Sequence, residues 1–258
     1  MSGARETAYL HALREAELDG ALAALAGRLD LAQAAVLEIG GADGRVASLL
    51  ARRCRHVASV DIAVPPAPLF PVQPYDGHRL PFADDSFDLL YSSHVMEHVR
   101  HFDAFQGELL RVLRPGGLAL HVVPTAGWRF WTLLAHYPAL PKLLTSRLAR
   151  RPDAGPSAGP AAARAPRGAG HLAMRLLAAA PHGETGSALA ELRHFAMAHW
   201  RRRFVARGWR LLDSGRLGLF YTGYVLSGGR LSLAARRRLA GVAGASSGFV
   251  LLAPAGAP

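Results

Sequence analysis

The residues whose types and spacing are best suited to chemistry lie in the segment VLEIGGADGRVASLL, residues 36–50. A short apolar run leads through Glu38 into a glycine-rich turn, and a helical pattern follows. A strand, a tight turn and a helix N-terminus in this order are typical of a site for a nucleotide-like ligand, because backbone N–H groups converge there. The turn does not have the G-x-G-x-x-G spacing of dinucleotide sites, and no P-loop lysine follows it.

Two acidic residues narrow the choice of ligand. Glu38 directly precedes the turn, where a carboxylate would repel a phosphate and suits a ligand with a positive charge at that place. Asp61 ends the next predicted strand, where a carboxylate can accept hydrogen bonds from both hydroxyls of a ribose. The alternative for each is structural, an ordinary turn after residue 40 and a strand-end cap at Asp61.

The motifs that follow are LPFADDSFDLLYSSHVMEHV, residues 80–99, and LRPGG, residues 113–117. Taken with the glycine turn and Asp61, they resemble the successive motifs of class I S-adenosylmethionine (SAM)-dependent methyltransferases, and most closely the subgroup often called type 11. The resemblance covers residues 35–124 and implies an enzyme that uses SAM as its cofactor. A looser resemblance of the last portion to bacterial methyltransferases of polysaccharide and natural-product pathways implies a small polar or glycan-type acceptor.

The resemblance also implies a position for each part of the cofactor. The implied contacts are Glu38, Gly40 and Gly44 around the methionine part, Asp61 at the ribose, Ile62 and Asp76 at the adenine, and Ser92, Ser93 and His94 beside the reacting methyl. Ala42 stands where the family more often has glycine. Its methyl group is tolerable if the backbone φ angle there is negative.

Methyl transfer from a sulfonium to an oxygen or nitrogen is an SN2 step that depends mainly on alignment in a dry pocket. A hydroxyl acceptor also needs a base for its proton, and histidine suits that role near neutral pH. The candidates, in order of preference, are His94, His136 and His182. No metal is required for this chemistry.

A different chemistry is possible at HVMEH, residues 94–98. His94-x-x-Glu97-His98 has the inverzincin spacing, in which two histidines on one helical face bind zinc beside a glutamate base. A third ligand would have to come from elsewhere, and Glu184 and Glu191 are the guesses. A zinc hydrolase is therefore a remote alternative.

Hydrophobic periodicity predicts a Rossmann-like α/β fold, with a seven-stranded, mostly parallel sheet and helices on both faces. The predicted strands include 35–39, 56–61, 86–93, 118–124, 208–226 and 248–254. We expect N-terminal helices and a SAM-binding core over 1–125, a helical and flexible substrate-binding insertion over 126–207, and C-terminal strands over 208–258 that complete the sheet. Within the insertion, the low-complexity segment 151–170 is expected to be disordered or a mobile flap.

The charge is unevenly distributed. Residues 1–125 have a net charge of −4 and residues 126–258 a net charge of +15. The basic half suggests an acidic substrate, a membrane surface or nucleic acid, although a GC-rich genome would also enrich arginine. Nucleic-acid methylation or binding is the main alternative function. Against it, the sequence has YSSH at residues 91–94, where a nucleic-acid methyltransferase would have a catalytic tetrad of the NPPY type. A non-enzymatic protein with the same fold is a further alternative.

The remaining composition favours a cytoplasmic protein. No apolar run reaches the roughly 18 residues of a membrane span, and the N-terminus carries acidic residues rather than a secretory signal. The single cysteine, Cys54, excludes an internal disulfide and a cysteine-based zinc site. The aromatic segment 128–138 could form an acceptor pocket, core of an added subdomain, or a peripheral membrane contact.

Overall fold

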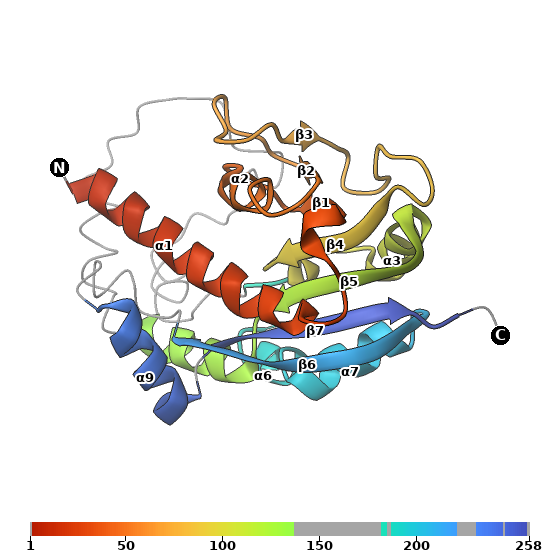
Figure 1. Ribbon diagram of the computed structural model, residues 1–258. Helices are drawn as coiled ribbons and strands as arrows, with labels where there is room; N and C mark the ends of the chain where they lie inside the picture. Colours follow the sequence, from red (N-terminus) through yellow and green to blue (C-terminus); the bar gives the residue numbers. More distant parts are fainter. Residues whose placement is uncertain (1, 137–181, 185–186, 221–230, 245, 257–258) are drawn as a thin grey trace, which may run out of the picture.

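A computed structural model describes residues 2–136, 182–184, 187–220, 231–244 and 246–256. These residues form a seven-stranded sheet with the strand order β3-β2-β1-β4-β5-β7-β6 (Figure 1). The strands are β1 (Ala35–Ile39), β2 (His56–Asp61), β3 (Gln73–Pro74), β4 (Phe87–Ser93), β5 (Leu113–Val123), β6 (Trp209–Phe220) and β7 (Ser246–Pro254).

The first five strands are parallel to one another, and β7 is the strand that runs in the opposite direction to its neighbours. β1 pairs in parallel with β2 and β4, β2 with β3, and β4 with β5, whereas β7 runs antiparallel to both β5 and β6. All five residues of β1 are buried, as expected for a central strand covered on both faces. The predicted seven-stranded, mostly parallel Rossmann-like sheet is therefore confirmed.

Helices cover both faces of the sheet (Figure 1). Leucines and alanines of α1 (Ser2–Leu22) and α2 (Arg45–Leu50) pack on one face. Aromatic and aliphatic side chains of α3 (Phe102–Val112) and α7 (Met197–Val205) pack on the other. Because strand residues alternate between faces, Val36 belongs to the first cluster and Leu37 to the second.

Some of the other helical elements also contribute to these two core clusters, through Leu25, Met96 and Trp128. Residues 126–136 form a helix after β5. Short helical turns and helices complete the described elements: η1 (Ala23–Leu25), η2 (Leu31–Gln33), η3 (Met96–His98), α6 (Ala190–His194) and α9 (Leu233–Ala243). Among the described residues, no helix is long and apolar enough to cross a membrane.

Three sequence predictions need correction or stay open. The strand predicted over 118–124 begins earlier than expected, because β5 already starts at Leu113 and includes the RPGG segment. A register shift against β4 between Phe87 and Leu89 absorbs the extra residues, with Gly116 at a φ of +80°. The segment 151–170 lies outside the described residues. The division into three parts at 125 and 207 stays a prediction.

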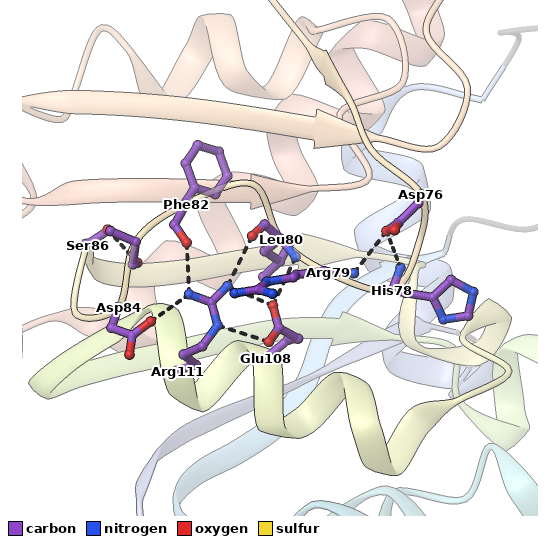
Figure 2. A network of polar contacts seen from close by, with 10 residues as sticks. Asp76, His78, Arg79, Leu80, Phe82, Asp84, Ser86, Glu108 and Arg111 are labelled. Carbon is purple, nitrogen blue, oxygen red and sulfur yellow. Dashed lines mark hydrogen bonds and ion pairs between the residues drawn. The ribbon is translucent and has the colours of Figure 1, made fainter.

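A polar network fastens the loop between β3 and β4 to α3 (Figure 2). The Arg111 guanidinium donates hydrogen bonds to the carbonyls of Leu80 and Phe82, at 3.0 and 2.8 Å, and to the carboxylates of Asp84 and Glu108. Glu108 in turn accepts a bond of 3.0 Å from the Leu80 N–H. One side chain thus fixes the loop that leads from Asp76 into β4.

We expect Arg111→Met to lower the free energy of unfolding by about 2 kcal/mol, because it leaves two carbonyls and a partly buried carboxylate without their donor. Urea denaturation at pH 7, followed by circular dichroism, measures this. The matched control is Arg52→Met, at an exposed position, which should change stability by less than about 0.5 kcal/mol. Equal effects of the two substitutions would contradict the role assigned to the network.

Candidate active site

A cavity of about 1190 Å³ opens at the carboxyl ends of β1, β2 and β4. The sheet order places β1 between β2 and β4, so the chain leaves neighbouring strands toward opposite faces and a crevice remains between them. Its lining includes Arg14 and Glu17 of α1, Glu38 and Gly40, Asp61 and Ile62, Tyr75 to His78, Ser93 to Val95, Trp128, His136 and His182. The cavity is where the fold class binds its ligands.

The glycine turn after β1 forms one wall. Gly40 has a φ of +82°, and a Cβ there would collide with the Val95 side chain. Gly44, at the start of α2, also has a positive φ. It packs against the backbone of Phe70 and does not line the cavity. Of the two glycines predicted to contact the methionine part, Gly40 therefore lies at the cavity and Gly44 does not.

Ala42 departs from the expectation of a negative φ. Its φ is +46°, in the left-handed region that costs an L-residue about 1–2 kcal/mol. The Ala42 N–H donates to Asp61 Oδ2 at 2.7 Å, which holds the peptide in this orientation. Ala42 thus adopts a strained backbone conformation, and this hydrogen bond offsets part of the strain.

Glu38 is a buried carboxylate at the cavity wall, with 3% of its surface exposed. Its Oε2 accepts a bond of 2.7 Å from Ser59 Oγ. Burial raises the pKa of Glu38 to about 7, and the nearby charges of Asp43 and Asp61 act in the same direction. A ligand with a positive charge would compensate this site, and the amino group of SAM meets that requirement.

The residues predicted for the nucleoside side lie together at the cavity. Asp61 ends β2, and Ile62 beside it is 70% exposed, an apolar surface that a flat ring could cover. Asp76 Oδ1 accepts hydrogen bonds from the N–H groups of His78 and Arg79, at 2.8 and 2.9 Å (Figure 2). These turn bonds hold the Asp76 carboxylate at the cavity rim.

The two serines predicted beside the methyl group differ in their surroundings. Ser93 lines the cavity and donates to Glu17 Oε2 at 3.0 Å. Ser92 is fully buried, does not line the cavity, and is bonded to His121 Nδ1 at 2.8 Å. Burial lowers the pKa of His121 to about 3, so this histidine is neutral.

His94 lies at the cavity between two buried carboxylates. Its Nε2 is 3.4 Å from Glu17 Oε1, and its Nδ1 is 3.4 Å from Glu97 Oε1. Burial alone would lower the pKa of His94, but the charge and hydrogen bonds of Glu17, followed by those of Glu97, raise it to about 10. With its proton held in this way, His94 is poorly suited to accept another one, which disfavours the first choice of base.

The other two predicted histidines, His136 and His182, also line the cavity. His182 Nε2 is 3.5 Å from Glu97 Oε1, and its ring packs edge-on against Trp128. Glu191 Oε1 accepts the N–H groups of His182 and Gly183, at 2.6 and 2.7 Å. This short segment is thereby fixed at the cavity.

The inverzincin interpretation of residues 94–98 is wrong in its geometry. The segment continues from β4 into the single 3-10 turn η3, and His94 has a φ of +53°, so the two histidines do not share a helical face. Glu184 pairs with Arg100 and Glu191 with Arg129, so neither guessed third ligand joins the group. The residues that do come together are His94, Glu97 and His182.

Two cavity residues of α1, Arg14 and Glu17, were not predicted from the sequence. Arg14 donates to Asp43 Oδ1 at 2.9 Å, and His11 contacts the other oxygen of Asp43. Glu17 is 4% exposed although it is a charged residue of α1. The one available signal was a glutamate next to the leucine face of that helix.

Comparison with known proteins agrees with this geometry. A family model described as a methyltransferase domain matches residues 9–172, which is more than half of the chain. The chain belongs to this family. The predictions of a class I SAM-dependent methyltransferase, of an enzyme and of SAM as cofactor are thereby confirmed, and the type 11 subgroup is compatible with the match.

Similar proteins are themselves described only broadly. An uncharacterized methyltransferase of Mycobacterium avium (strain 104) is 57% identical over 44 residues, 17% of each chain. Another, of Mycolicibacterium gilvum (strain PYR-GCK), is 36% identical over 96 residues, 33% of this chain and 37% of the relative. The match thus spans 17% of the length of the first of these curated relatives and 37% of the second.

One solved structure with the same fold is an S-adenosylmethionine dependent methyltransferase from Mesorhizobium loti. It has a TM-score of 0.50 and 14% identity, and the alignment covers 90% of this chain and 97% of that one. At this identity the similarity establishes the arrangement of the sheet and helices. The acceptor has to be argued from the cavity itself.

Proposed function

We propose that the protein transfers a methyl group from SAM to a hydroxyl oxygen, or a nitrogen, of a small, polar, uncharged acceptor such as a sugar. The observation that carries the acceptor class is the charge of the cavity. Among the described residues, six carboxylates and two guanidinium groups line it: Glu17, Glu38, Asp43, Asp61, Asp76 and Glu184, with Arg14 and Arg100. Such a lining attracts the cationic cofactor and disfavours a phosphate-bearing acceptor.

This charge argues against the nucleic-acid alternative. The net charge of +15 belongs to residues 126–258, and no described arginine of that half lines the cavity. A polyanion would therefore meet acidic groups where the reaction takes place. A polar acceptor without charge avoids this repulsion and can hydrogen-bond to the imidazoles at His98, His101 and His136.

SAM supplies a methyl group on a sulfonium, which a correctly aligned nucleophile can attack directly. The protein's task is to align the acceptor, exclude water and take up a proton. As the acceptor oxygen forms its bond to the methyl carbon, the carbon–sulfur bond breaks and its electrons return to sulfur. The hydroxyl proton then passes to an imidazole, for which we propose His182 or His136, since His94 already holds its proton between Glu17 and Glu97.

Calorimetric titration with SAM and S-adenosylhomocysteine tests the cofactor assignment. We expect micromolar binding of both, and a loss of about 10- to 150-fold in Asp61→Ala, since hydrogen bonds to a charged group contribute about 1.5–3 kcal/mol. Asp19→Ala is the matched control, because Asp19 pairs with Arg53 at the surface and does not line the cavity. Absence of SAM binding in the unmodified protein would refute the proposal. If SAM binds, methylation rates measured with a panel of sugars and with a panel of charged acceptors test the acceptor class.

A further inference from the structure

Glu97 is a fully buried carboxylate beside the cavity, next to the imidazoles of His94 and His182. Its side chain has 0% exposure, and neither carboxylate oxygen has a hydrogen-bond partner of normal geometry among the described residues. The nearest polar atoms are His94 Nδ1 at 3.4 Å and His182 Nε2 at 3.5 Å from Oε1. Both distances exceed the 2.7–3.2 Å of a normal N–H···O hydrogen bond. The two imidazoles are ion-pair partners of Glu97, but its oxygens lack the short hydrogen bonds that usually accompany the burial of a carboxylate.

The same distances match the spacing of atoms around a metal ion. Zinc binds imidazole nitrogen and carboxylate oxygen at about 2.0–2.2 Å, so two ligand atoms in a tetrahedral shell lie roughly 3.3–3.5 Å apart. One ligand atom from each of His94, Glu97 and His182 lies within 4.8 Å of the other two. We propose that these three residues form a binding site for a divalent transition-metal ion.

The hydrogen bonds around the ligands orient them for this role. His94 Nε2 lies 3.0 Å from Ser247 Oγ and 3.4 Å from Glu17 Oε1, on the side of the ring away from Glu97. A metal-binding histidine usually donates its second ring N–H to a carboxylate or similar acceptor, which leaves the other nitrogen for the ion. Nδ1 of His94, the atom that faces Glu97, is therefore the ligand atom, and the ion replaces a proton there.

His182 is held in place by its backbone. Glu191 accepts the N–H groups of His182 and Gly183 and is paired with Arg129 at 2.7 Å. Both Glu191 and Arg129 are buried, so the support is rigid. Two of the three ligands thus come from loops that separate buried interactions fix, as a preorganised metal site requires.

The ligand set indicates the class of ion. Two imidazoles and one carboxylate suit Zn²⁺, Co²⁺, Mn²⁺ or Fe²⁺, whereas Mg²⁺ and Ca²⁺ prefer oxygen ligands. Three protein ligands leave at least one coordination position open, which is typical of catalytic rather than structural sites. His94 and His182 line the cavity, so the open position faces the acceptor space. In this part the inference rests on the proposed function, since the ion would bind the acceptor oxygen and ease its deprotonation. With His182 bound to the ion, His136 is the imidazole at the cavity that takes the proton.

The test is metal binding by the full-length protein after EDTA treatment and removal of the chelator. Titration with Co²⁺, followed by its visible absorption, and with Zn²⁺, followed by calorimetry, should show one equivalent bound with a dissociation constant of about 1 μM or below. Glu97→Gln and His182→Gln should each weaken binding at least about 100-fold, since each removes a ligand. His56→Gln removes an exposed histidine away from the cavity and should bind like the unmodified protein.

SAM binding is measured on the same samples, which separates this inference from the proposed function. Retained SAM binding in His182→Gln shows that the variant is folded and that the cofactor site is intact. Failure of the unmodified protein to bind a stoichiometric ion while it binds SAM overturns the metal site alone. Metal binding that is unchanged in both ligand variants also overturns it. If Glu97→Gln does not fold, His182→Gln decides the question.

Discussion

Glu38→Gln is expected to stabilise the ligand-free protein by about 3 kcal/mol at pH 8 and to weaken SAM binding at least about 100-fold. In the folded protein, burial raises the pKa of Glu38 from its ordinary value of 4.5 to about 7. A carboxyl group with a raised pKa contributes most to stability below pH 4.5, and the contribution is lost as the pH rises through 7. At pH 8 the ionised Glu38 therefore destabilises the fold, and an uncharged amide of the same shape does not.

The loss of binding follows from the same burial. The cationic amino group of SAM would lie near a carboxylate that has no positive partner among the residues that the structure describes. Removing one member of a buried charge pair costs about 2–5 kcal/mol. Affinity for SAM should accordingly rise between pH 6 and pH 8 in the unmodified protein, as Glu38 ionises. The variant should lose most of this dependence on pH.

Urea denaturation at pH 4 and pH 8, together with calorimetric titration of SAM, measures both effects. At pH 4 the two proteins should be almost equally stable. Glu15→Gln is the control, because Glu15 pairs with Arg45 at a more exposed position and does not line the cavity. A variant that is less stable than the parent at pH 8, or that binds SAM equally well, would show that Glu38 is mainly structural.

The sequence could locate most of the residues proposed to hold the cofactor at one cavity, because they belong to local strand-turn motifs. Val36 to Ile39 form an uninterrupted buried run, so the end of β1 and the position of the glycine turn could be located. Asp61 followed from the end of the next strand in the same way. Residues that end neighbouring parallel strands come together at one edge of the sheet, whatever the details of the loops.

The acceptor half depends on contacts that local patterns do not encode. Glu17 lies 77 positions before His94 and is brought to it by the way α1 packs against the sheet. Its buried environment could not be seen in a helix in which Asp19 is exposed and Glu15 is half-buried. The inverzincin spacing failed for a related reason, because it assumes an α-helix where the backbone has a positive φ at His94 and a 3-10 turn after it.

Gly44 shows how a residue of a ligand-binding motif can act through packing. We expect Gly44→Ala to lower the free energy of unfolding by about 3–5 kcal/mol. This value is the sum of the cost of a left-handed backbone at alanine and the cost of a steric clash. Gly44 has a φ of +75°, and a Cβ there would lie 2.6 Å from the Phe70 nitrogen and 2.7 Å from its carbonyl oxygen. Because both atoms belong to the backbone, no change of rotamer can relieve the contact.

Gly27→Ala separates the two contributions to this cost. Gly27 has a similar φ of +70°, but a Cβ there would meet nothing within 4 Å, so its substitution should cost only about 1–2 kcal/mol. Urea denaturation compares the two variants, and SAM titration at low temperature follows the fraction of Gly44→Ala that remains folded. A folded variant that binds SAM normally would assign Gly44 to the scaffold. A stable variant that has lost SAM binding would instead place Gly44 in contact with the methionine part, as the motif alone implies.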